Sequence, residues 1–365
     1  MVENFLKNEE RALLGLRSLY RAYGYLPFKM SKFEEYDLYV RNKDFLVSDR
    51  IIAFNDTNGK LMALKPDVTL SIIKNAEDAV GVKQKVYYNE NVYRVSRRTG
   101  QFKEIMQAGL ECVGDIDSYD LYETVLLAAE SLAMISEEFV LDVSHLGILT
   151  ALLDEIGGDA AWRREVAACV ASKNRHDLEK LCEGLPTEQT AKLCACIEIY
   201  GEAGEVLEAL EPICTGAAAR AALEELRGLA ELLAGSAHAN RIRFDFSIVN
   251  DMSYYNGIVF RGFLAGISEG VLAGGQYDKL LRRMGRKGGA VGFAIYLDLL
   301  EELEAERKEH DVDVLVLYDE FTPSALLAET VRSLVAAGSC VSAQKAIPRN
   351  LRYRSLRDCR KGEGK

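Results

Sequence analysis

Three motifs between residues 250 and 300 contain residue types that could shape a small-molecule pocket. They are Asn-Asp-Met-Ser-Tyr-Tyr-Asn-Gly at 250–257, Gly-Gly-Gln-Tyr-Asp at 274–278 and Gly-Phe-Ala-Ile-Tyr-Leu-Asp-Leu-Leu at 292–300. Tyrosines beside glycines can surround and orient an amino acid, whereas a polyphosphate needs fixed guanidinium groups. None of the three motifs contains an arginine. They therefore suit an amino acid better than ATP.

A second set of polar residues lies in the run Leu-Lys-Pro-Asp-Val-Thr at 64–69, where a strand is expected to end and a helix to begin. Asp67 and Thr69 are residue types that cap helices for backbone reasons alone. The functional alternative is that both face a pocket and bind an ammonium group. The sequence leaves these two interpretations equally weighted.

The third set lies on two neighbouring predicted strands. Gln107, Gly109 and Glu111 fall on one face of an extended strand, and the glycine between the two polar side chains is typical of close approach by a ligand or backbone. Arg94 on the other strand could form a bidentate interaction with a carboxylate or phosphate. The alternative is a cross-strand Arg–Glu pair on a solvated face, which contributes little and which the strands alone favour.

The elements needed to position these residues follow from hydrophobic periodicity. We expect an amphipathic helix over residues 3–23, a hairpin over 50–65 and a helix over 68–78. Strands are expected over 85–95 and 102–113, joined by a polar loop, as in an antiparallel sheet that gains strands. Helical patterns then cover 118–136 and 148–235, and alternation typical of a strand resumes at Arg241.

Charge concentrates at 301–310, which indicates a domain boundary. Beyond it, a strand at 312–317, a helix at 324–337 and a strand at 340–343 predict the start of a small βαβ domain. We expect four parts: a core over 1–147, a helical insertion over 148–238, the rest of the core over 239–308 and a shortened α/β domain over 309–365.

Composition narrows the classes of function. The 365 residues carry a formal net charge of −11, with a pI near 5.1, which argues against a protein built to coat nucleic acid. The eight cysteines follow an N-terminus without a secretory leader, so we expect reduced thiols and a cytoplasmic protein. None of the four histidines lies in the motifs, and the cysteine spacing predicts no metal site. No apolar run is long enough for a membrane span, and we expect no cofactor.

In this order the motifs closely resemble the core of the class II histidyl-tRNA synthetases, over roughly residues 5–305. The resemblance implies an α+β fold: a class II aminoacyl-tRNA synthetase-like antiparallel sheet flanked by helices, with a helical insertion and a shortened C-terminal α/β domain. It also implies a histidine-like pocket in which Asp67, Glu111 and Gln107 hold amino or imidazole groups and the tyrosines orient the ring. The full set of implied pocket residues is Asp67, Thr69, Arg94, Gln107, Glu111, Tyr254, Tyr255 and Tyr277.

Several positions depart from the synthetase pattern. Asn250 stands where the family has an arginine before its Gly-Leu-Asp-Tyr-Tyr run, and Leu299 stands where a second arginine contacts ATP phosphates. Other substitutions in the class-defining motifs are Ser31 for a proline, Ser96 for a glutamate, Gln101 for an arginine and Tyr296 for a glycine. Loss of arginines that stabilise transition-state charge costs orders of magnitude in rate. Amino-acid activation is therefore expected to be lost, and no catalytic residue is predicted.

A synthetase-like chain with its amino-acid pocket kept and its ATP site degraded resembles the regulatory subunits of ATP phosphoribosyltransferase. That resemblance implies a homodimerising, non-catalytic chain that joins a short-form catalytic subunit in a hetero-octamer, for the first step of histidine biosynthesis and its inhibition by histidine. The alternatives are a divergent ligase that forms an aminoacyl-adenylate and a histidine sensor for some other effector.

The last 21 residues carry a local net charge of +6 in an otherwise acidic chain. A basic tail could touch RNA, but we expect a solvated or frayed end. Because the C-terminal domain is also shortened, tRNA is not expected as a partner.

Overall fold

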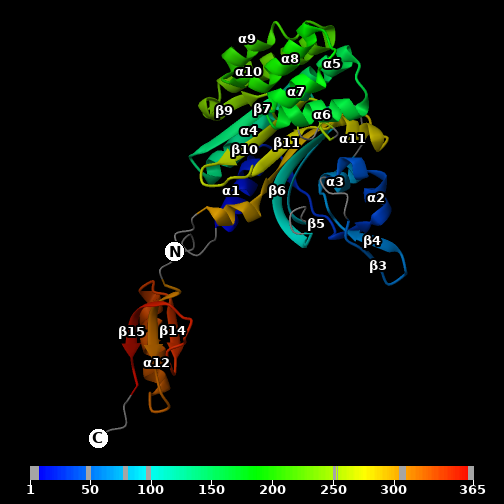
Figure 1. The fold of residues 1–365 in the computed structure, drawn as a ribbon. Coiled ribbons are helices and arrows are strands. Elements are labelled where there is room, and N and C mark those ends of the chain that lie inside the picture. The colour runs from blue at the N-terminus through cyan, green and yellow to red at the C-terminus, as the bar shows by residue number, and fades with distance from the viewer. Residues whose placement is uncertain are drawn as a thin grey trace. The chain divides into compact units, whose positions relative to one another are not determined.

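The computed structural model describes residues 8–46, 51–76, 81–95, 100–249, 252, 254–303 and 310–360. Contacts divide the chain into a large compact unit, Asn8–Leu303, and a small one whose described part is residues 310–360. The large unit is built on a nine-stranded sheet in the order β1-β5-β6-β12-β11-β10-β7-β9-β8 (Figure 1). Adjacent strands are antiparallel except for the parallel pairs β1/β5 and β7/β9. The predicted α+β fold is confirmed.

The strands of this sheet differ greatly in length. They are β1 (Leu26–Pro27), β5 (Lys83–Val95), β6 (Phe102–Gly114), β7 (Phe139–His145), β8 (Tyr200–Gly201), β9 (Ile242–Asp245), β10 (Ile258–Leu264), β11 (Leu272–Gln276) and β12 (Gly289–Tyr296). The long strands β5 and β6 agree with the strands predicted over 85–95 and 102–113. In the register of β6 and β12, Gln107 lies opposite Tyr296 and Glu111 lies opposite Gly292. This register decides which side chains share the site.

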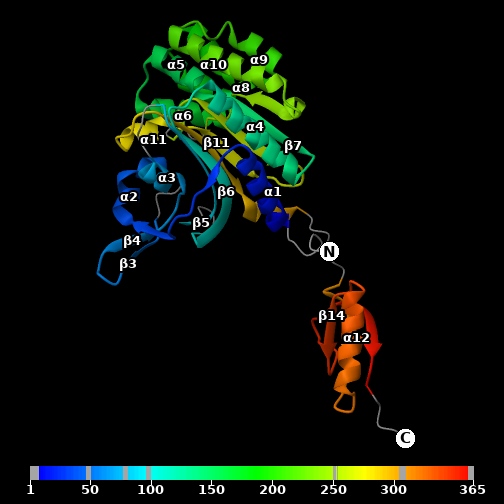
Figure 2. The same cartoon turned by 180° about the vertical axis from the view of Figure 1, so that it is seen from behind.

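Helices cover both faces of the sheet. They are α1 (Asn8–Ala22), α2 (Tyr36–Arg41), α3 (Thr69–Asn75), α4 (Ser118–Ile135), α5 (Leu146–Ile156), α6 (Ala160–Ala171), α7 (Arg175–Leu181), α8 (Thr187–Glu198), α9 (Ala203–Leu210), α10 (Ala217–Ala234) and α11 (Asp278–Arg283). Short 3-10 turns occupy Lys43–Phe45, Ala239–Arg241 and Leu297–Glu302. The helices α1 and α4 pack on one face, whereas α3 and α11 contact β6 and β12 (Figures 1 and 2).

Two apolar clusters follow from this layering. The larger one includes Leu16, Leu127 and Phe293, on the side of α1 and α4. The smaller one includes Ile72 and Val86, around α3 on the opposite face. Because successive residues of a strand point to opposite faces, β6 contributes Leu110 to the larger cluster and turns its neighbour Glu111 toward α3. The polar residues of the site therefore lie on the α3 side.

A small three-stranded sheet packs against α2. Its order is β2-β4-β3, with β2 at Phe33–Glu35, β3 at Ala53–Asn55 and β4 at Leu61–Leu64. The predicted hairpin corresponds to β3 and β4, and the turn between them is tied by the Asp56 carboxylate, which accepts from Asn58 N and Lys60 N, each at 2.8 Å. The strand β4 of this sheet ends at Leu64, shortly before α3 begins at Thr69.

The helices α5 to α10 occupy the segment assigned to the insertion (Figure 1). Within it, α10 packs on α5 and on α4, and its end leads back to the main sheet through β9. The strand expected from Arg241 ends at Asp245, and β7 was not predicted. The division of the chain into four parts stays a prediction.

The small unit contains β13 (Val312–Leu317), α12 (Ser324–Ala336), β14 (Val341–Gln344) and β15 (Tyr353–Asp358). Both β14 and β15 pair in parallel with β13, so the predicted βαβ start is present. Residues 353–358 of the basic tail form β15 and are largely exposed, so the expected solvated end agrees with the structure there and the alternative of a frayed end is wrong. Pairing with the buried strand β13 orders them despite their exposed arginines.

Candidate functional site

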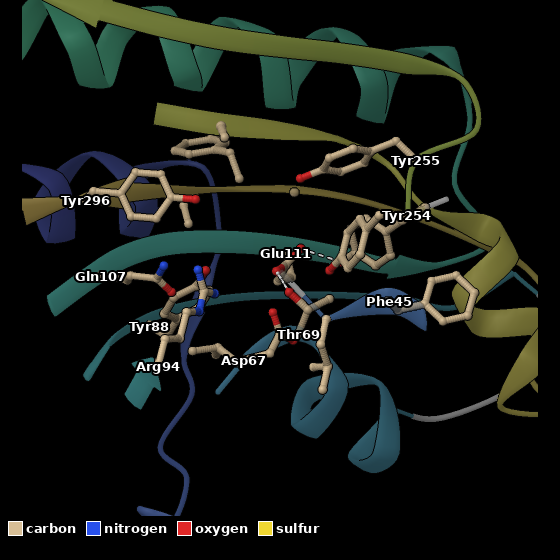
Figure 3. A pocket seen from close by; sticks show the side chains of 17 residues that line it. Phe45, Asp67, Thr69, Tyr88, Arg94, Gln107, Glu111, Tyr254, Tyr255 and Tyr296 are labelled. Atoms are coloured by element: carbon tan, nitrogen blue, oxygen red, sulfur yellow. Dashed lines mark hydrogen bonds between the residues drawn. The ribbon is translucent and has the colours of Figure 1, made fainter. Parts of the chain in front are cut away.

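All eight predicted pocket residues line one cavity of about 90 Å³ on the α3 side of the main sheet (Figure 3). A single buried water needs only about 10–15 Å³, so this cavity can hold a small organic molecule. The residues come from the β4–α3 junction, from β5 and β6, and from the segments before β10 and after β11. The fold thus brings together the residue sets that the sequence holds far apart.

The β4–α3 junction serves both structure and cavity. The Asp67 Oδ1 atom accepts from Leu70 N at 3.0 Å, which satisfies one of the free backbone donors at the helix start. Thr69 instead donates its hydroxyl to Glu111 Oε1 at 2.7 Å. Asp67 therefore stabilises the start of α3 and lines the cavity, whereas the Thr69 hydroxyl is directed to the carboxylate across it.

Glu111 is a buried carboxyl group of the cavity whose pKa is strongly raised. It is 2% exposed, and Tyr277 donates its hydroxyl to Glu111 Oε2. Burial raises the pKa of Glu111 to about 8, the hydroxyl donors Tyr277 and Thr69 oppose that rise, and the charge of Asp67 adds to it. A buried carboxyl group held by two hydroxyls is suited to receive a cation, because a cation favours its ionised form.

Gly292 makes room for this carboxyl group. A Cβ atom at residue 292 would lie 1.7 Å from Glu111 Oε2 and 2.5 Å from the Leu110 carbonyl oxygen. No other residue type fits there without moving β6 or the carboxylate. The glycine that begins the third motif is thus explained by its cross-strand neighbour.

Arg94 is buried at the edge of the cavity. Its Nε donates to the Pro66 carbonyl oxygen at 2.8 Å, and its cross-strand neighbour is Lys103. Burial raises the pKa of Asp67, and the charge of Arg94 acts against that rise. The alternative of a solvated Arg–Glu pair is wrong, because Arg94 faces the cavity and the carboxylate of Asp67.

Aromatic rings form one wall of the cavity. The Tyr254 ring lies 4.7 Å from that of Tyr255, edge to face, and 5.6 Å from that of Tyr277. Phe45 continues the wall with its centroid 6.3 Å from Tyr254. Such edge-to-face arrangements are favourable for aromatic pairs and leave flat faces for a planar group.

Sequence reasoning missed four aromatic residues that line the cavity, namely Phe45, Tyr88, Phe293 and Tyr296. Tyr88 could have been found, since it lies six residues before Arg94 on one strand and therefore points to the same face. Its hydroxyl occupies the space left by Gly109, where a Cβ would lie 2.6 Å from it. The sequence alone identifies Tyr296 only as a departure from the synthetase pattern.

The departures from the synthetase pattern fall in different places. Tyr296 enters the cavity, whereas Leu299 packs against the larger apolar cluster. Ser31 accepts a hydrogen bond from Phe33 N at 3.1 Å at the start of β2. Asn250 and Ser96 lie outside the described residues.

The residues that the structure describes lack two kinds of feature. Among them, no three or more His, Cys, Asp or Glu side chains are grouped so as to hold a metal ion. None of the helices in the described ranges has both the length and the apolar character that crossing a bilayer requires.

Comparison with known proteins gives a consistent assignment. The family model described as histidyl-tRNA synthetase matches residues 2–300. The ATP phosphoribosyltransferase regulatory subunit of Geobacter metallireducens is 30% identical over 305 residues, which cover 79% of this chain and 69% of that one.

Two solved structures share the fold. One, from Bacillus halodurans, is described as an ATP phosphoribosyltransferase regulatory subunit/histidyl-tRNA synthetase. It has a TM-score of 0.77 at 23% identity and covers 97% of this chain and 94% of its own. A chain of the ATP phosphoribosyl transferase (HisG:HisZ) complex from Thermotoga maritima gives a TM-score of 0.63 at 21% identity, covering 80% and 98%. On the sequence matches, the chain belongs to the histidyl-tRNA synthetase family and, within it, to the ATP phosphoribosyltransferase regulatory subunits.

Proposed function

We propose that this chain assembles with a short-form ATP phosphoribosyltransferase catalytic subunit and regulates the first step of histidine biosynthesis. Its membership of the regulatory-subunit family supports this role. The Thermotoga maritima structure of similar fold is a complex that contains such a chain. In this proposal the catalytic chemistry belongs to the partner.

We propose that the cavity beside α3 binds histidine. The observation that carries the proposal is the placement of two buried carboxyl groups, an amide and an aromatic wall around one cavity. Asp67 and Gln107 would hold the α-amino group, Glu111 would hold the imidazole, and the rings of Tyr254 and Tyr255 would orient it. A buried acid that gains a cation recovers part of the desolvation cost of its charge.

Feedback regulation then follows from linkage. A ligand shifts an assembly only by as much as it prefers one arrangement over another. We propose that the chains pair as homodimers within a hetero-octamer, and that histidine binds the inhibited arrangement more tightly.

The eight free cysteines, five of them buried, support a reducing compartment such as the cytoplasm.

The second candidate function is an active ligase. The buried guanidinium of Arg94 beside Asp67, which such a ligase would use, is retained. A ligase that forms an aminoacyl-adenylate would show histidine-dependent exchange between pyrophosphate and ATP. We expect no exchange and no tRNA charging. Robust exchange by the purified chain would establish the ligase instead.

Reconstitution tests the main proposal. The chain is mixed with a short-form catalytic subunit, and phosphoribosyl-ATP formation is followed with and without histidine. We expect the mixture to be more active than the catalytic subunit alone and to be inhibited by histidine. Activity unchanged on mixing would refute the regulatory role, and activation that histidine does not reverse would refute the feedback.

A further inference from the structure

A second cavity, of about 160 Å³, adjoins the first. The two cavities share Tyr255, Ala273 and Tyr296 as lining residues. In Figure 3 the hydroxyl groups of Tyr255 and Tyr296 point toward one another across the upper side of the first cavity. These two tyrosines therefore stand between the cavities.

The strand register places a cation in the second cavity. Arg261 on β10 lies opposite Ala273 on β11, which lies opposite Ala294 on β12 and then Gly109 on β6. Directly opposed residues of neighbouring strands share a face, so Arg261 is on the same face as the first cavity. It also lines the second cavity.

The guanidinium of Arg261 forms no ion pair with its acidic cross-strand neighbour, Asp142. Asp142 lies opposite it on β7, yet the buried Asp142 Oδ1 atom has no hydrogen-bond partner among the described residues. Among the described residues, no carboxylate forms an ion pair with Arg261, whose guanidinium carbon lies 5.5 Å from the Phe263 ring centroid.

The backbone is shaped around this side chain. A Cβ atom at Gly270 would lie 2.3 Å from Arg261 Nε, so the glycine provides the space that the guanidinium occupies. Apolar side chains of Leu146, Ile248 and Val259 form much of the remaining wall. Ligand sites combine apolar walls with a few placed polar groups, and a partly desolvated guanidinium binds oxyanions strongly.

We propose that the second cavity binds an oxyanion, a carboxylate or phosphate group of a small molecule, and that Arg261 is its anion-binding residue. The site does not require histidine in the first cavity. It uses a cation on β10, outside the set of eight residues around Glu111.

The test is calorimetric titration of the full chain with inorganic phosphate and, separately, with acetate, at constant ionic strength. We expect at least one anion to bind with a Kd on the order of 1 mM. Phosphate binding alone would identify a phosphate site, and acetate binding would identify a carboxylate site. Binding of neither anion would overturn the proposal.

Matched variants distinguish a specific role of Arg261 in anion binding from an effect of the net charge of the protein. Arg261→Ala should weaken anion binding at least about tenfold, whereas Arg261→Lys should retain part of it. Arg243→Ala is the control, because Arg243 belongs to the same cross-strand row but lies 3.7 Å from Glu202. Equal binding by Arg261→Ala and the wild type would contradict the assignment.

Gly270→Ala provides an independent variant should Arg261→Ala fail to fold. The added methyl group displaces the guanidinium without removing its charge. We expect anion binding to fall in this variant as well, with thermal unfolding confirming that the chain remains folded. Unchanged binding in Gly270→Ala would argue against a site built around Arg261.

Discussion

Glu111 joins the stability of the fold to the chemistry of the cavity. Its pKa is raised by burial to about 8, above the ordinary carboxyl value of 4.5. Between these values the folded state holds a proton that the unfolded state releases. The contribution of protonated Glu111 to the stability of the folded state is complete below pH 4.5 and is lost as the pH rises through the folded-state pKa of about 8.

Glu111→Gln tests this linkage. We expect the variant to lose the decline in the free energy of unfolding that Glu111 causes between about pH 5 and pH 8, on the order of 4 kcal/mol, since this window spans about three pH units and one pKa unit corresponds to about 1.4 kcal/mol. Urea unfolding at several pH values measures it. Glu104→Gln is the control, because the pKa of exposed Glu104 is lowered by hydrogen bonds from Asn91 and Tyr93 and lies below this window. A variant as pH-dependent as the wild type would show that Glu111 is ionised throughout.

At the scale of elements, the site depends on the close approach of β6 and β12. Glu111 lies opposite Gly292 in their register, and its carboxylate occupies the space of the missing side chain. Thr69 and Tyr277 then hold the carboxylate from α3 and from the start of α11. Three elements therefore position one acid.

Gly292→Ala should disturb this contact. The extra methyl group must displace the carboxylate or the strand, so we expect destabilisation of about 1–3 kcal/mol and weaker histidine binding. Gly228→Ala in α10 is the matched control, because a Cβ there meets no atom within 4 Å. That variant should be neutral or stabilising by up to about 1 kcal/mol. Thermal unfolding and calorimetry measure both, and similar behaviour of the two variants would contradict the packing account.

Local pattern predicted the elements that carry most of the site. Strict alternation along β6 placed Gln107 and Glu111 on one face, and the turn residues between β3 and β4 predicted their hairpin. The strands β7 and β15 were not predicted, and for β15 the reason is physical. In β15 the run from Tyr353 to Asp358 lacks apolar alternation, and its order comes from pairing with β13, which lies far from it in sequence.

At the scale of the molecule, all eight predicted pocket residues belong to the compact unit Asn8–Leu303. Their convergence could not be derived from spacing, because it depends on pairing between strands such as β6 and β12 that are distant along the chain. Resemblance to a known family supplied that step. Only the structure shows which further residues complete the aromatic wall, among them Phe45 and Tyr88.

Removal of the small unit tests whether the site is self-contained. A chain that ends after Leu303 should fold and bind histidine within about twofold of the full chain, since all eight pocket residues belong to the large unit and parts without shared partners usually interact by less than about 0.5 kcal/mol. Circular dichroism and calorimetry measure this. Loss of binding in a folded truncated chain would show that the small unit contributes to the site.

The central claim is that the cavity around Glu111 and Asp67 carries the response to histidine. The most direct measurement is histidine inhibition of the reconstituted complex with wild-type chain or with Asp67→Asn, which keeps an oxygen for Leu70 N but removes the charge. We predict that the variant still activates the catalytic subunit but needs about tenfold or more histidine for half-inhibition, since a hydrogen bond to a charged group contributes about 1.5–3 kcal/mol. Equal inhibition of both complexes would contradict the account and place the histidine site elsewhere.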